Sequence, residues 1–257
     1  MHRRNKRGFH KNRRIMKRTV AAIFAVSILG AAMFLAQAYK TRGDRAGIVS
    51  VTGLGNLDFE SDEIVWTGTF SRKNVNLSEG FAEIKSDRSK IEQYLLNKGV
   101  SIDEIRFQQV STQENEQSVY NEQGKYVGSK FETYELSQTV KLQSNDLDVV
   151  SGISREISEL LNEGVQIRSD NPKYYYTKLD ELKLNLIEQA SENGRIRAEQ
   201  IARNSKSTLQ GLKSARLGVF QILGYNSGES YSWSGTFNTS SRWKTASITV
   251  KMDFEVE

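Results

Sequence analysis

The chain has 257 residues, of which 37% are hydrophobic and 26% charged, a composition that argues against a disordered or wholly membrane-embedded protein. The 36 Lys and Arg outnumber the 31 Asp and Glu and give a net charge of +5. Cysteine is absent and the two histidines are His2 and His10, so disulfides, thiolate zinc sites and Cys/His nucleophiles lack their residues. These absences favour a chain with no metal, no cofactor and no catalytic residues, although carboxylates could still hold a hard cation or act as a pair.

The positive charge is concentrated at the N-terminus. Residues 1–18 contain nine Lys and Arg and no acid, and residues 19–39 contain no charged residue. A basic stretch followed by about 20 apolar residues is typical of a signal peptide or an N-terminal membrane anchor. We assign residues 1–38 to this segment and residues 39–47 to a linker before the folded part.

Two alternatives are open for this segment. Ala36 and Ala38 occupy the positions that a signal peptidase reads, so cleavage before Tyr39 would release the rest of the chain. An uncleaved segment would instead anchor the chain with its N-terminus in the cytoplasm. Both alternatives export residues 40–257. Without the nine leader charges, 27 Lys and Arg face 31 acids, about −4, and a mildly acidic exported chain argues against a nucleic-acid partner.

The folded part, residues 48–257, opens with strand patterns over residues 48–55 and 63–70. We interpret them as a bent or bulged strand pair, with Gly53 and Gly55 at a structural turn or bulge. These two glycines lack the third glycine and the following helix of a dinucleotide-binding fingerprint.

Two amphipathic helices are predicted next. Asn76 begins the first one, whose apolar spacing continues to a stop at Gly99. The second covers residues 146–162 and stops at Gly164. The hexapeptides at residues 95–100 and 160–165 match at five of six positions. Either two independent helix ends share a common stop signal, or one β-α-β-β unit is used twice.

A long hairpin lies between the two helices. Its predicted strands are residues 102–114 and 129–143, and its polar tip, residues 115–128, is expected to be mobile. The hairpin and the second helix, about residues 102–176, could form one subdomain. The predicted fold class is α+β, with two related β-α-β-β-like units in antiparallel sheets, a long C-terminal helix and a C-terminal strand.

The C-terminal part contains a helix pattern over residues 178–205 and strand patterns over residues 217–223 and 246–256. Small residues in the second half of the helix indicate close packing. The loop between the strands, residues 224–242, is long for a compact domain, so it is either functional or disordered. Its aromatic residues are candidates for a binding loop: Tyr225, Tyr231, Trp233 and Phe237.

The order of these parts resembles the SIMPL-domain family over nearly all of residues 46–257. The residues that carry the resemblance are the strand at 49–55, the Gly99-Val100 turn with the strand after it, Tyr174 to Tyr176, the helix from Leu179 to Ala202, and the strand at 217–222. The resemblance implies an α+β protein of the bacterial periplasm or outer surface. In some members it implies a link to oxidative-stress defence, and in others a large channel-like homo-oligomer. It supplies no catalytic residues.

The leading expectation is a non-enzymatic envelope protein that acts by homo-oligomerisation or by contact with another envelope protein or the membrane. One alternative is a hydrolase that uses two of the 31 acids, although no spacing singles out a pair. Another is a lipid- or carbohydrate-binding module that uses the aromatic loop at residues 224–243.

Overall fold

The computed structural model describes residues 25–37 and 47–257. Residues 25–37 form an exposed helix. The rest of the predicted leader and most of the linker, with Ala38 and Tyr39, lie outside the described residues. Among the helices of the described ranges, none combines the length and the apolar character that a membrane crossing requires.

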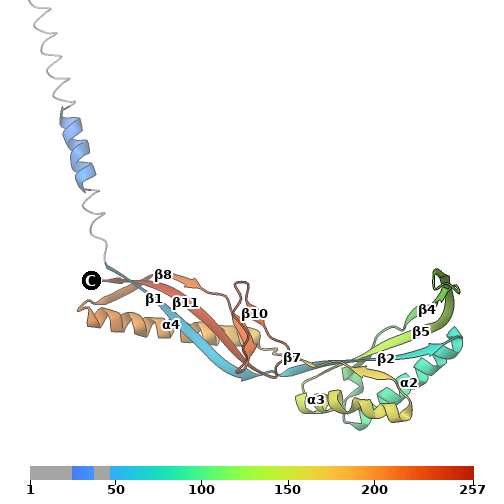
Figure 1. Ribbon diagram of the computed structural model, residues 1–257. Helices are drawn as coiled ribbons and strands as arrows, with labels where there is room; N and C mark the ends of the chain where they lie inside the picture. Colours follow the sequence, from blue (N-terminus) through green and yellow to red (C-terminus); the bar gives the residue numbers. More distant parts are fainter. Residues whose placement is uncertain (1–24, 38–46) are drawn as a thin grey trace, which may run out of the picture. The chain divides into compact units, whose positions relative to one another are not determined.

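Residues 47–257 form an α+β fold with two sheets, as predicted (Figure 1). The elements in chain order are β1 (Gly47–Glu60), β2 (Glu63–Asn74), α2 (Leu77–Asn97), β3 (Ile105–Phe107), β4 (Ser111–Tyr120), β5 (Tyr126–Ser144), α3 (Leu147–Glu156), β6 (Ile167–Ser169), β7 (Lys173–Tyr175), α4 (Leu179–Asn204), β8 (Leu209–Leu217), β9 (Gln221–Gly224), β10 (Thr236–Phe237) and β11 (Trp243–Val256). One sheet has strand order β1-β11-β9-β10, with β8 also on β11, and the other has order β3-β5-β2-β6, with β4 on β5 and β7 on β2.

The six-stranded sheet consists of two β-α-β-β units, β2-α2-β3-β4 and β5-α3-β6-β7. The first strands of the units, β2 and β5, pair antiparallel from Ile64↔Ser144 to Asn74↔Tyr134. The two outer strands of each unit pair with the first strand of the other unit, since β3 and β4 lie on β5 whereas β6 and β7 lie on β2. The two units therefore complete one another within a single sheet.

The repeated hexapeptide forms the same hydrogen-bonded chain reversal twice, once after α2 and once after the 3-10 segment Ile157–Glu163 that follows α3. In residues 95–100 and again in residues 160–165, the valine N–H donates to the first leucine carbonyl and the glycine N–H donates to the second, at 3.0–3.2 Å. Gly99 and Gly164 have φ of +92° and +78°, a region that favours glycine. This pair of bonds is a Schellman motif, which returns the chain to the core after each helix.

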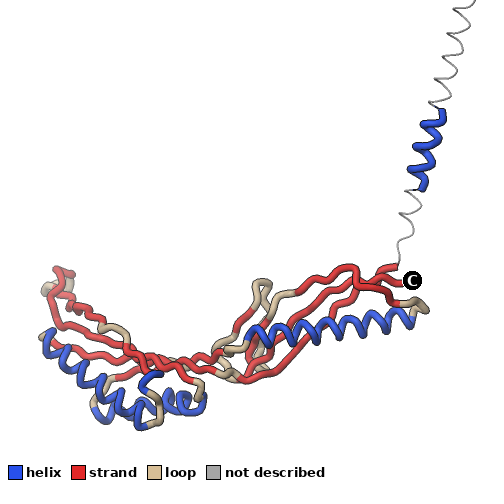
Figure 2. The backbone as a smooth tube through the Cα atoms, turned by 180° about the vertical axis from the view of Figure 1, so that it is seen from behind, coloured by secondary structure: helices blue, strands red, loops and turns tan. Residues whose placement is uncertain are grey.

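Helices α2 and α3 pack on one face of this sheet (Figure 2). Their shared core includes Trp66 and Phe70 of β2, Ile91 of α2 and Ile153 of α3, all 1% exposed or less. Because the core combines both units, the predicted hairpin and second helix share their buried surface with β2 and α2.

A partly buried ion pair joins three segments beside this core. Arg72 of β2 donates two hydrogen bonds to Asp87 of α2, at 2.6 and 2.8 Å, and a third to the carbonyl of Gly164 at 2.5 Å. Bidentate geometry of this kind fixes orientation as well as charge. The second Schellman turn is thereby tied to the first unit.

The hairpin between the helices is more regular than predicted. Both strands continue into the tip, β4 to Tyr120 and β5 from Tyr126, so the irregular segment is residues 121–125 alone. The Asn121 carboxamide oxygen accepts from the N–H of Gln123 and of Lys125, which replaces the ladder bonds that the turn lacks. The predicted strand ends at residues 114 and 129 were wrong because the exposed residues beyond them still pair across the ribbon, from Asn115↔Thr133 to Tyr120↔Tyr126. The predicted first strand also differs, because residues 102–104 form a 3-10 turn.

The predicted pairing of the first two strands was also wrong, because β1 and β2 belong to different sheets. Gly53 and Gly55 are not turn residues but lie within β1. A Cβ atom at Gly53 would overlap the carbonyl oxygen of Ala190, and one at Gly55 would overlap that of Leu186. The two glycines therefore allow α4 to approach the backbone of β1, which explains the small residues on the helix.

The chain divides into a larger compact unit, residues 52–196 and 216–251, and a smaller one. The smaller unit consists of the described residues before 52 together with residues 197–215 and 252–257. Its buried apolar side chains are Val51, Ala198, Ala202, Met252 and Phe254. Asp253 accepts hydrogen bonds from the hydroxyls of Ser50 and Ser214, at 2.6 and 2.7 Å.

The contact between α4 and β1 predicts that the stability of the fold is sensitive to any side chain added at Gly53. Gly53→Ala should destabilise the fold by about 1–3 kcal/mol, because the added methyl group meets backbone atoms that cannot rotate away. Gly211→Ala in β8 is the matched control, since a Cβ atom there meets nothing within 4 Å. Urea unfolding of both variants measures the difference, and equal midpoints would contradict the assigned role of Gly53.

Candidate functional site

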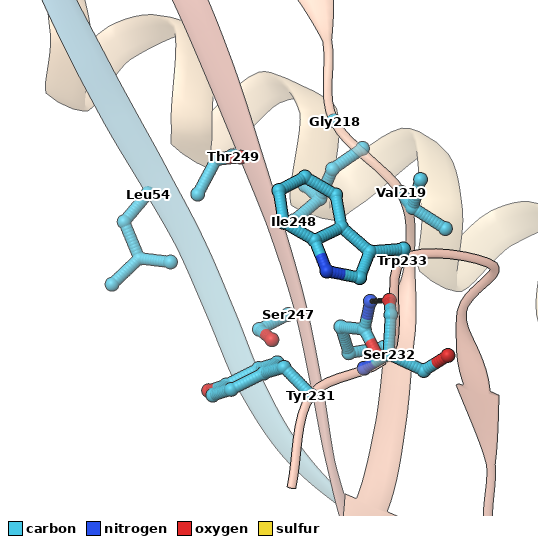
Figure 3. Close-up of a pocket in the computed structure, with 10 residues that line it drawn as sticks. Leu54, Gly218, Val219, Tyr231, Ser232, Trp233, Ser247, Ile248 and Thr249 are labelled. Atoms are coloured by element: carbon cyan, nitrogen blue, oxygen red, sulfur yellow. Dashed lines mark hydrogen bonds between the residues drawn. The ribbon is translucent and has the colours of Figure 1, made fainter.

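A groove with a volume of about 660 Å³ lies on the sheet face that α4 leaves uncovered (Figure 3). Successive side chains of a strand point to opposite faces, so Leu54 faces the groove while Gly53 and Gly55 face α4. The lining residues all belong to the larger unit: Leu54, Gly218, Val219, Gln221, Tyr231, Ser232, Trp233, Ser247, Ile248 and Thr249.

The loop that carries Tyr231 and Trp233 is held by one buried side chain. Gln221 of β9 is buried, and its carboxamide donates to the carbonyl of Ser232 at 2.7 Å and accepts from the Ser232 N–H at 3.2 Å. This two-point pairing imitates a strand ladder and fixes the residue between the two aromatic rings (Figure 3). The rings therefore stand on a backbone segment that is hydrogen-bonded within the chain, and the expectation that this loop is either functional or disordered stays a prediction.

A second polar cluster holds the base of the loop. The Glu229 carboxylate accepts from the N–H of Gly224 at 2.9 Å and from the Asn238 carboxamide at 2.5 Å. Asn238 in turn donates its N–H to the carbonyl of Ile222 and accepts from the N–H of Ser241. The Gly224 N–H, followed by the Asn238 side chain, lowers the pKa of Glu229, because both donors favour the charged carboxylate.

This cluster predicts how the loop responds to acid. Because the pKa of Glu229 is lowered in the folded chain, its stabilising contribution is complete above the usual glutamate pKa of about 4.3 and is lost as the pH falls through the lower folded value. The amide resonance of Gly224 should therefore shift with a midpoint below about 4.3. Glu229→Gln should abolish this titration, and a midpoint at or above the usual value would contradict the assignment.

The four predicted aromatic residues do not form one site. Tyr231 and Trp233 line the groove, whereas Tyr225 and Phe237 do not. Phe237 lies in β10 instead, with the Lys244 ammonium 5.9 Å from its ring centre. The groove residues of the strands were not predicted, because Leu54 lay between two glycines assigned to a turn. The strand predicted over residues 217–223 differs from the structure, in which β8 ends at Leu217 and β9 begins at Gln221. Gln221 could have been noticed as the one polar residue in that otherwise apolar segment.

Lys244 is the least expected side chain near the loop. It is 1% exposed, and its ammonium donates to the carbonyl of Tyr174 at 2.6 Å. Burial lowers the pKa of Lys244 to about 8, since a charged ammonium is costly away from water. Its position among backbone and aromatic groups, without a lining role in the groove, indicates a structural role.

Lys244 should give the protein a measurable dependence of stability on pH. Below pH 8 the lysine is charged in both folded and unfolded chains, and above its unfolded pKa of about 10.4 it is neutral in both. Between these values folding favours loss of the proton, so stability should rise by about 3 kcal/mol. Urea unfolding of the wild type and of Lys244→Met from pH 7 to pH 10.5 isolates this contribution. A constant difference between the two proteins would refute it.

The groove offers contact surface and few reactive groups. Among the described residues that line it, none is Asp, Glu, Lys, Arg or His. No group of His, Cys, Asp and Glu that could hold a metal occurs in the described residues. Trp233 is 100% exposed and Tyr231 70% exposed, and in Figure 3 they lie with Leu54 and Val219 around the opening. The arrangement can bury apolar and aromatic surface of another molecule.

The comparisons with known proteins concern the whole of this fold. A family model described as "SIMPL: Protein of unknown function (DUF541)" matches residues 49–255. The chain belongs to the SIMPL family. The resemblance inferred from the sequence is thereby confirmed, and the SIMPL region runs from β1 to β11 and includes every groove residue. No curated protein matches the chain.

Proposed function

We propose that this SIMPL-family chain is a non-enzymatic protein of the bacterial cell envelope that acts by binding, through association with further copies of itself or with an envelope partner. The observation that carries the proposal is Trp233, a fully exposed indole on an ordered loop beside an apolar groove. Exposed aromatic side chains on rigid backbone are typical of binding surfaces, because they supply large contact area with little loss of conformational entropy.

The envelope location is supported by the sequence. Nine positive charges precede an uncharged stretch of 21 residues, and the remaining chain is mildly acidic. After residue 10 the chain has neither cysteine nor histidine, so a role in oxidative-stress defence would not operate through thiol chemistry or histidine-bound metal. Assembly or partner contact would then be its contribution to such a defence.

The alternatives receive unequal support from the groove. A hydrolase would need two convergent carboxyl groups, and the groove is lined by none. A carbohydrate or lipid ligand is compatible with Tyr231 and Trp233 above a sheet face that also carries Ser247 and Thr249. Self-association is favoured over a small ligand because Trp233 projects fully into solvent, where a partner of protein size would cover it.

Trp233→Ala should weaken self-association at least tenfold, because truncation of an exposed aromatic anchor typically costs at least about 1.4 kcal/mol of binding. Folding should change by less than about 0.5 kcal/mol, since the side chain is fully exposed. Tyr225→Ala is the matched control, because Tyr225 is an exposed aromatic residue of the same loop that does not line the groove.

The measurement is sedimentation velocity with light scattering on the full chain in mild detergent over a wide concentration range. A monomer at every concentration would refute self-association. Equal masses for the Trp233 and Tyr225 variants would remove the groove from the interface. Loss of glycan or lipid-vesicle binding in Trp233→Ala, without any change of mass, would favour the ligand alternative.

A further inference from the structure

The six-stranded sheet has a second face, on the side away from α2 and α3, which we call the polar face (Figure 2). Side chains of β2 and β5 alternate between the core and this face, and those on the polar face are partly or fully exposed. At its centre the two strands form a floor of neighbouring hydroxyl groups, those of Thr67, Thr69, Ser71, Ser137 and Thr139.

Each β-α-β-β unit places an arginine beside this hydroxyl floor. The dipeptide Ile-Arg begins the first outer strand of both units, at Ile105-Arg106 in β3 and at Ile167-Arg168 in β6. Both isoleucines are buried in the core, so both arginines point to the polar face. Because β3 and β6 lie at opposite ends of the order β3-β5-β2-β6, the two arginines flank the floor, about 16 Å apart by strand spacing.

A third cation, Lys141 of β5, lies directly opposite Arg106 in the ladder. Like charges in this position destabilise a strand pair. Charged side chains on outer strands protect a sheet edge, which would explain the arginines but not a lysine on a central strand. Within residues 25–37 and 47–257, neither Lys141 nor Arg106 forms an ion pair. The fold therefore does not account for this pair of cations.

The acids of the polar face leave the three cations available to a ligand. The Nε of Arg168 lies 3.6 Å from Asp170, which is beyond hydrogen-bonding distance. The acids instead accept hydrogen bonds from uncharged side chains: Glu63 from Gln143 at 2.8 Å, Glu135 from Asn115 at 3.1 Å and Asp170 from Thr67 at 2.8 Å.

We propose that the polar face binds an acidic polysaccharide, a glycan whose sugar rings carry carboxylate groups. An arginine guanidinium binds a carboxylate through two parallel hydrogen bonds. Serine and threonine hydroxyls donate and accept hydrogen bonds, as the hydroxyl groups of a sugar do. Two arginines on either side of a hydroxyl floor thus fit an extended glycan with repeated acid groups. This binding site lies apart from the groove and does not depend on the proposed self-association.

A pocket of about 440 Å³ beside Arg168 gives the glycan a place to enter. Its lining includes Thr69, Ser71 and Ser137 of the hydroxyl floor. Glu135 also lines it, and the charge of this acid is offset by a lysine, Lys73, 3.6 Å away. The volume is in the range of small-molecule sites, so the pocket accommodates a sugar ring.

Two features favour a carboxylated glycan over a phosphate polymer or a nucleic acid. The side chains that β2 and β5 place on the polar face include no aromatic ring on which a base could stack. Residues 40–257 carry 27 Lys and Arg against 31 acids, so a polymer of dense negative charge is repelled by the molecule as a whole. A few separated cations suit a polymer whose charges are widely spaced.

Calorimetric titration of the full chain in mild detergent with polygalacturonate tests the proposal, with uncharged dextran and with polyphosphate for comparison. Arg106→Gln and Arg168→Gln should each weaken binding at least about tenfold, because each removes a two-point contact with a carboxylate. Arg106→Lys should weaken it as well, since lysine keeps the charge but lacks the planar fork. Lys85→Gln is the matched control, because it removes one positive charge from the exposed surface of α2, on the other side of the sheet.

The stability of the variants separates binding from folding. Because Arg106 lies opposite Lys141, Arg106→Gln should leave the midpoint of urea unfolding unchanged or raise it. Weaker binding at equal or higher stability cannot result from unfolding. A lower midpoint would show that Arg106 serves the fold and would contradict the proposal.

A wild-type chain that does not bind polygalacturonate would overturn the proposal and leave self-association through the groove untouched. Equal weakening by Lys85→Gln, or equally tight binding of polyphosphate, would reduce the binding to net charge and overturn it too. Equally tight binding of dextran would show that the carboxylates are not recognised. Loss of polygalacturonate binding in Trp233→Ala would place the glycan in the groove and not on the polar face.

Discussion

The close contact between α4 and β1 determines which face of the five-stranded sheet stays open. Gly53 and Gly55 let the helix backbone approach the strand so closely that no side chain fits between them. One face of the five-stranded sheet is thereby filled, and the alternation of the strand turns Leu54 to the opposite face. The groove exists because the other face has only a loop above it.

The loop over the open face of the sheet is held in place by hydrogen bonds from polar side chains. Gln221 fixes Ser232 from below, and Glu229 with Asn238 fixes the ends of the loop. Because these bonds are made within the free chain, the backbone of the loop is held before the aromatic rings meet any partner. A few polar contacts therefore hold the loop that carries the apolar surface.

Features that depend on neighbouring residues could be predicted from the sequence. Contacts between residues far apart in the chain could not. Asn76 and Gly99 act on neighbouring backbone, so the limits of the first helix could be predicted from their spacing. The second helix was predicted as one stretch to residue 162, whereas α3 ends at Glu156 and a 3-10 segment continues to Glu163. The role of Gly53 depends on a helix more than 130 residues later in the chain, and no local rule distinguishes that role from a bulge. The composition of the loop showed that it is rich in aromatic residues. Which of the four rings line the groove could not be read from composition, because Tyr231 and Trp233 are placed by the hydrogen bonds of Gln221 to Ser232 between them.

The two β-α-β-β units provide an internal comparison that bears on the hairpin. In the second unit, β7 pairs with β2 over three residues, and this short pairing suffices to complete the sheet. In the first unit the corresponding strand, β4, has ten residues and continues to an exposed apolar tip. The additional length of β4 is not required by the shared core, because in the second unit the three-residue strand β7 is enough to complete the sheet over that core. The exposed apolar side chains of the tip are therefore a feature that the fold of the single chain does not explain.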